Sequence, residues 1–127
     1  MAETTPAIRQ CIEHCLLCYS TCLGMAMRHC LDRGSEHAEP AHLRLMFACA
    51  GLCRNCAHVM LFDTRDHNQS CAMCAEVCED CARDCERIGG MDGCVAACRT
   101  CAESCREVAA DTQRRGFGAG SWGFTAA

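Results

Sequence analysis

Cysteines recur every three or four positions in four separate segments of the chain. An α-helix turns by about 100° per residue, so steps of three and four place these residues on one narrow stripe. Strands would need steps of two. The pattern therefore predicts four helices, each with cysteines at the core positions of a heptad. The stripes are Cys11, Cys15, Cys18 and Cys22; Cys49, Cys53 and Cys56; Cys71, Cys74, Cys78, Cys81 and Cys85; and Cys94, Cys98, Cys101 and Cys105.

Helix boundary signals flank the first two stripes. Thr5 and Pro6 are typical of an N-cap followed by the first helical residue, and Gly34 is expected to end this helix after about Asp32. A polar linker over 33–39 follows. Pro40 can open the second helix, which we expect to end near Asp63.

Similar signals flank the other two stripes. Asp66, with Gln69 three residues later, resembles a capping box for the third helix. Gly89 and Gly90 are expected to end that helix, and Asp92 is a candidate N-cap for the fourth, which Gly116 would stop.

Short connections between consecutive helices favour antiparallel neighbours. We therefore predict an all-α protein, an antiparallel four-helix bundle with a cysteine-lined core in residues 1–115. Residues 116–127 would form a glycine-rich and aromatic C-terminal tail.

Composition narrows the function. The chain has 127 residues, 17 of them cysteine, and a net charge of −4 with all 12 basic residues arginine and scattered. These values disfavour general nucleic-acid binding, and no apolar run could span a membrane. The N-terminal residues do not resemble a secretory signal, so we expect a cytoplasmic protein. An odd cysteine count and helical spacing also disfavour a disulfide scaffold.

So many core cysteines indicate metal binding by thiolates. If the cysteines only filled the core, each would give up about 1.5–3 kcal/mol of the stabilisation that a large buried apolar side chain provides at the same position. Thiolates select Cu(I), Zn(II) or iron–sulfur clusters. A continuous seam suits Cu(I) best, because two or three sulfurs satisfy each ion and one monovalent ion per thiolate leaves the interior neutral. Zn or Cd storage, a ferredoxin-like iron–sulfur protein and a thiol oxidoreductase stay open as alternatives.

Over residues 6–112 the sequence resembles the bacterial copper storage proteins, in its four cysteine stripes, its repeated C-x-x-x-C pairs and the His and Met residues near one end. The resemblance implies a cytosolic protein, not an enzyme, that stores many Cu(I) ions, roughly one per cysteine, inside a four-helix bundle. It also implies a homotetramer.

The two ends of the predicted tube differ. One end would collect neutral ligands through which copper enters and leaves: Met25, His29, His42, Met46 and Met91, next to Cys85 and Cys94. Cys30, a further candidate ligand, is expected on the flank of this end, about 80° around the helix from Cys22. The opposite end would offer mainly Met60 and His67, with Cys11, Cys71 and Val108. His37, His58, Met27 and Met73 are expected to point away from the tube.

Overall fold

The computed structural model describes residues 5–62 and 67–114, and every regular element in these ranges is helical. The elements are α1 (Pro6–Gly24), η1 (Met25–Cys30), α2 (Leu31–Arg33), η2 (Ser35–Ala38), α3 (Pro40–Leu61), α4 (His67–Ile88) and α5 (Asp92–Arg114). The predicted all-α fold is confirmed. Among the described residues, none of the helices contains an apolar stretch that could span a lipid bilayer.

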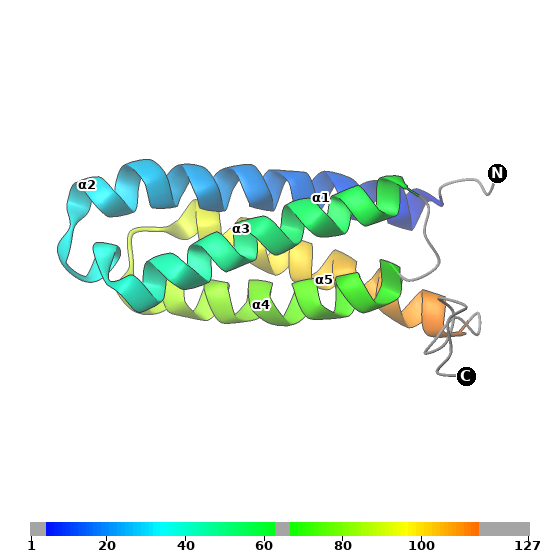
Figure 1. The fold of residues 1–127 in the computed structure, drawn as a ribbon. Helices are drawn as coiled ribbons and strands as arrows, with labels where there is room; N and C mark the ends of the chain where they lie inside the picture. The colour runs from blue at the N-terminus through cyan, green and yellow to red at the C-terminus, as the bar shows by residue number, and fades with distance from the viewer. Residues whose placement is uncertain (1–4, 63–66, 115–127) are drawn as a thin grey trace, which may run out of the picture.

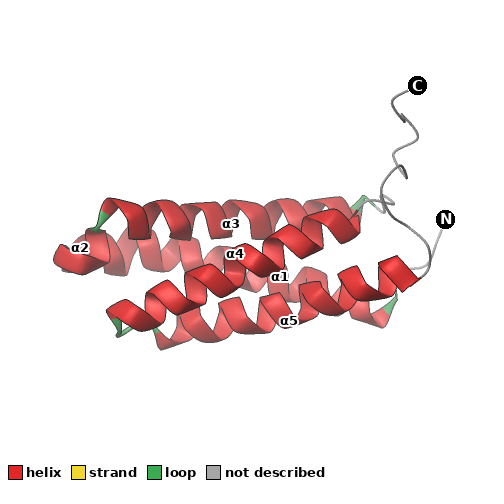
Figure 2. Ribbon diagram, turned by 90° about the horizontal axis from the view of Figure 1, so that it is seen from below, coloured by secondary structure: helices red, strands yellow, loops and turns green. Residues whose placement is uncertain are grey.

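Four long segments run side by side in alternating directions, as Figures 1 and 2 show. The first of them is continuous through α1, η1 and α2. It packs against α3 and α5, and α4 also packs against α3 and α5. We call the end that contains η1, η2 and the α4–α5 turn the loop end, and the end where α1 and α4 begin the terminus end.

The boundary signals act as the sequence predicts at most positions. The hydroxyl oxygen of Thr5 accepts a hydrogen bond from the backbone N–H of Ile8 at 3.2 Å. Gly34, Gly89 and Gly90 have φ values of 68°, 86° and 73°, a left-handed backbone that favours glycine. These glycines end the first and third long helices where the sequence places their ends.

The start of α5 differs by one residue from the prediction. The carbonyl of Met91 accepts the bond from the N–H of Val95 at 3.0 Å, so Met91 takes the cap position and Asp92 is the first helical residue. The carboxylate of Asp92 still lies in the first turn, where its negative charge interacts favourably with the positive end of the helix dipole. The expected helix end near Asp63, the cap at Asp66, and Gly116 with the tail 116–127 lie outside the described residues.

The segment η1 changes which residues of the first long helix face the core. It is a π-helix, whose turn contains one residue more than an α-turn. Side chains beyond it are rotated back by roughly 100° relative to a continuous α-helix. Cys30, expected on the flank, is therefore fully buried in the core, whereas His29, expected on the stripe, is only half-buried. Both expected placements were wrong for this one reason.

Small side chains let the helices approach closely. The core consists mainly of fully buried cysteines, and alanines next to them in sequence flank the stripes. These alanines are Ala50, Ala57, Ala75, Ala82, Ala97 and Ala102. A thiol is shorter than a leucine side chain, so a dense core of cysteines requires backbones that lie close together. The alanines leave room for that approach.

We predict that Ala82→Leu lowers the free energy of unfolding of the metal-free protein by about 1–3 kcal/mol, because Ala82 is fully buried and the added carbons must displace a neighbouring helix. Ala72→Leu, at an exposed position on the same helix, is the matched control. Urea unfolding of both reduced variants measures the difference. Equal stability of the two would contradict a close alanine contact.

Candidate metal centre

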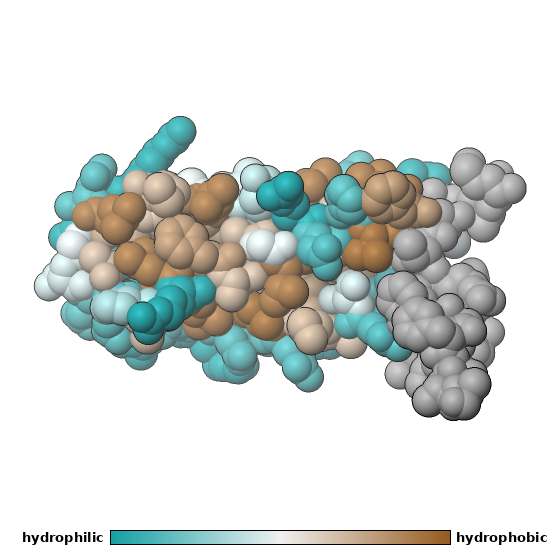
Figure 3. Space-filling model, in the orientation of Figure 1, coloured by the Kyte–Doolittle hydropathy of each residue, from teal (hydrophilic) through white to brown (hydrophobic). Residues whose placement is uncertain are grey.

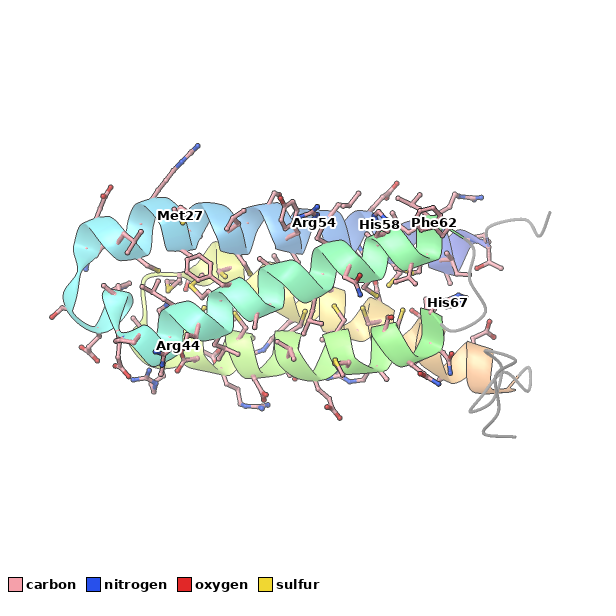
Figure 4. The ribbon with its side chains drawn as sticks, in the orientation of Figure 1. Met27, Arg44, Arg54, His58, Phe62 and His67 are labelled. Atoms are coloured by element: carbon pink, nitrogen blue, oxygen red, sulfur yellow. The ribbon has the colours of Figure 1, made fainter. Side chains whose placement is uncertain are left out.

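The thiols of the bundle form one buried set. All 17 cysteines are free and buried. Figure 4 shows their sulfur atoms in the space between the four helices, with Met27, Arg54 and His58 on the outside. The tube of thiols predicted from the heptad pattern is therefore present.

Sulfur atoms contact one another along almost the full length of this tube. Consecutive Sγ atoms lie between 3.2 and 4.0 Å apart on a path that crosses repeatedly between helices. The path runs Cys11, Cys105, Cys15, Cys101, Cys53, Cys78, Cys49, Cys98, Cys22, Cys94, Cys85 and Cys81. Cys18 lies beside it, 3.7 Å from Cys98, and Cys74 3.6 Å from Cys53.

The spacing suits ions that share sulfurs. A metal–thiolate bond is about 2.3 Å long, so two sulfurs on one ion lie about 3.8 Å apart in a tetrahedral site and about 4.0 Å apart in a trigonal one. Several sets of four thiols have all their sulfurs within 4.8 Å of one another. The sets overlap, since Cys18 and Cys49 each belong to two of them. Neighbouring ions would therefore bridge through common thiolates.

Burial opposes loss of the thiol protons until a metal binds. Contacts with neighbouring cysteine sulfurs, together with burial, raise the pKa values of Cys53 and Cys105. Burial likewise raises the pKa of Cys30. A buried thiolate without a positive partner is costly. Binding of a metal therefore displaces the thiol protons, and a cation must replace the charge that each proton carried.

A cluster of different composition lies at the loop end. The Sγ of Cys30 is 3.5 Å from Nε2 of His42, 3.7 Å from Sδ of Met46 and 3.9 Å from Sδ of Met91. All four residues are at most 1% exposed. The cluster, which we call the mixed cluster, combines one thiol with an imidazole and two thioethers, three donors that need no deprotonation.

The sequence analysis did not identify Asp84, which lies behind the mixed cluster. Its Oδ2 accepts a hydrogen bond from Nδ1 of His42 at 2.7 Å. Partial burial raises the pKa of Asp84, but hydrogen bonds from His42 and Arg87 and the charge of Arg87 outweigh it, and the net shift in the pKa is downward. Its position one residue before Cys85, beside a histidine on another helix, leaves no signal in the sequence.

Two histidines pair at the outer side of the loop end. The rings of His29 and His37 meet edge to face with centroids 5.1 Å apart. His37, expected to be exposed, is 9% exposed because η2 brings its Nε2 within 3.1 Å of the carbonyl oxygen of Gly89, to which it donates. Nε2 of His29 is buried and has no hydrogen-bond partner among the described residues. Met25 is half-buried against the core.

The terminus end carries fewer neutral donors. Sδ of Met60 lies 3.9 Å from Sγ of Cys71, which is 3.4 Å from Sγ of Cys56. His67 begins α4 and is 9% exposed (Figure 4). Val108 is buried at this end as predicted.

The side chains that were expected to lie outside the tube do so, except for that of His37. His58, Met27 and Met73 are exposed. His14, at the edge of the first stripe, forms a hydrogen bond with the hydroxyl of Ser104 on α5.

The sequence pattern of the copper storage proteins matches residues 4–110 of the chain. The chain belongs to the copper storage protein family. This family match confirms the resemblance that the cysteine stripes indicate.

Solved structures agree with this membership. A protein from Nitrosospira multiformis is 48% identical, with a TM-score of 0.81 over 82% of this chain and 95% of its own. The Cu(I)-bound copper storage protein BsCsp3 is 32% identical, with a TM-score of 0.76 over 81% of this chain and 98% of its own. An uncharacterized cysteine-rich protein of Bacillus subtilis is 34% identical over 75 residues, 59% of this chain and 68% of its own length.

Proposed function

We propose that this member of the copper storage family holds many Cu(I) ions between the thiolates of its core. The observation that carries the proposal is the nearly continuous path of sulfur atoms, whose neighbours lie 3.2 to 4.0 Å apart. The Cu(I)-bound relative, matched over 98% of its length, supports the same ion. Thiolates are soft ligands, and Cu(I) is a soft ion.

The sharing of thiols favours Cu(I) over Zn or Cd. Zn(II) takes four ligands, so overlapping sets of four thiols cannot all be filled with independent sites. Doubly charged ions on shared thiolates would also accumulate positive charge in a buried tube. One Cu(I) for each of the 17 thiolates leaves the interior neutral. The motifs of iron–sulfur proteins usually curl a loop around the cluster, whereas these thiols lie along helices.

The proposed ligands are of two kinds. The thiolates bind most of the copper, and the neutral donors at the ends exchange it. The set comprises the 17 cysteines of the core together with Met25, His29, His42, Met46, Met91, Met60 and His67.

Storage fits the burial of the thiols better than catalysis does. A thiol oxidoreductase needs an accessible cysteine of low pKa, and all 17 thiols here are buried. We also propose a cytoplasmic location, because a core of 17 free thiols is typical of a compartment that keeps thiols reduced.

We further propose that copper enters at the loop end. The mixed cluster offers one thiol and three neutral donors, whereas the terminus end offers mainly Met60 and His67. Neutral donors bind Cu(I) more weakly than thiolates and release no proton, so they can accept an ion and pass it inward.

The homotetramer implied by the family finds support in the surface. Apolar side chains gather over α1 and α3, as the brown areas of Figure 3 show. Among the described residues, seven of the eight large apolar side chains that are exposed lie on the first long helix, on α3 or directly after α3: Leu16, Leu17, Met27, Leu31, Phe47, Leu61 and Phe62. An apolar face of this kind favours burial against another protein, and we propose further copies of this chain.

Anaerobic titration of the reduced protein against a Cu(I) chelator is expected to saturate at roughly 15–20 ions per chain, because each of the thiolates can bridge two ions while each ion takes two sulfurs. A count of free thiols before and after loading gives the number of sulfurs that bind copper, which can be compared with the number of ions bound. Saturation at four or fewer equivalents would indicate Zn-type sites or clusters, and visible absorption of the purified protein would indicate iron.

Joint replacement of His29, His42 and Met46 is expected to slow both copper loading and chelator-driven removal, while total capacity changes by only a few ions. Stopped-flow measurement of both rates tests this. Replacement of His67 and Met60 is the matched control for the terminus end. Wild-type rates in the triple variant, with slow rates in the control, would place the site of copper entrance at the terminus end.

Light scattering after size exclusion is expected to give the mass of a tetramer for the wild type. Leu17→Glu, at a position 57% exposed on α1, should weaken assembly because it places a charge on the apolar face. Met73→Glu, 56% exposed on α4, is the control outside that face. A monomeric wild type, or assembly lost only in the control, would contradict the proposed interface.

A further inference from the structure

The carboxylate of Asp84 is held between two hydrogen-bond partners, one at each of its oxygens. Its Oδ2 accepts from Nδ1 of His42 at 2.7 Å. Its Oδ1 accepts from the guanidinium of Arg87, at 3.0 Å from Nε and 2.8 Å from Nη2. Both oxygens are occupied, so the carboxylate cannot move away from either partner without losing a hydrogen bond.

This arrangement determines which nitrogen of His42 carries the proton. A carboxylate only accepts hydrogen bonds, so Nδ1 is the protonated nitrogen of the neutral ring and Nε2 keeps its lone pair. Nε2 is the atom that lies 3.5 Å from Sγ of Cys30, within the mixed cluster. A hydrogen bond from one ring nitrogen to a carboxylate is the usual way in which a protein orients the other nitrogen toward a metal.

We infer that Asp84 is a positioning residue, which holds His42 in the tautomer and orientation that present Nε2 to copper beside Cys30. The inference rests on the proposed function for the metal, but the state of the ring is a property of the metal-free protein. The competing explanation is that the pair only ties α3 to α4.

Asparagine at position 84 separates the two explanations. Asp84→Asn keeps the size of the side chain but leaves a single oxygen for two donors. The charged guanidinium of Arg87 makes the stronger bond and takes that oxygen, so the amide N–H₂ group faces Nδ1 of His42. The ring must then accept at Nδ1 and carry its proton on Nε2, which blocks the ligand atom while the contact between α3 and α4 persists.

Nitrogen NMR of histidine-labelled, metal-free protein reads the tautomer directly. We expect Nδ1–H in the wild type and Nε2–H in Asp84→Asn. Asp80→Asn is the control, because Asp80 lies on the same helix and pairs with Arg83 at the exposed surface, and its removal changes the net charge equally. The control should leave His42 as in the wild type. Nδ1–H retained in Asp84→Asn would overturn the inference.

Copper loading tests the consequence. Loss of the carboxylate that orients a metal-binding histidine costs about 10- to 100-fold in metal affinity or activity, so we expect Asp84→Asn to load Cu(I) about tenfold more slowly than Asp80→Asn. In a His42→Ala background, the same Asp84→Asn change should have no further effect. An equal slowing in that background would show that Asp84 acts through the packing of α3 and α4, and would overturn the inference. A wild type that binds few Cu(I) ions would refute the storage function, while the NMR result would still report on Asp84 and His42.

Discussion

Close contact between thiols is the constraint on which the rest of the structure depends. Sulfurs from four helices can meet at 3.2 to 4.0 Å only if the backbones lie close together, because cysteine is one of the shorter side chains. Alanines next to the stripes, such as Ala82 and Ala102, permit that approach. The short side chain brings each thiol within reach of neighbours on other helices, so the same packing of the bundle also sets the spacing of the proposed metal ligands.

The two ends of the tube differ in chemistry. Along the middle, each potential ligand loses a proton before it binds, and burial makes that loss difficult without an incoming cation. At the loop end the mixed cluster contains a single thiol, Cys30, among neutral donors. Ligands that are hard to ionise in the middle and neutral ligands at one end suit a protein that keeps ions inside and exchanges them through that end.

Much of the fold could be predicted from the sequence, because its signals are local. Steps of three and four place the cysteines on helical stripes whatever the rest of the chain does, and Gly34, Gly89 and Gly90 take the backbone conformations that their position suggests. The short connections then left the antiparallel bundle as the simplest arrangement. The sulfur-lined interior followed from these stripes, as did the preference for a soft metal ion.

At the loop end of the tube, the tertiary structure decides which side chains meet in the core. The π-turn of η1 exchanges His29 for Cys30 on the core side, and a count of residues that assumes a continuous α-helix cannot detect it. Asp84 on α4 contacts His42 on α3, although the two residues are 42 positions apart in sequence. Local periodicity determines which face of a helix is buried, whereas contacts between helices depend on register and packing, which only the folded chain defines.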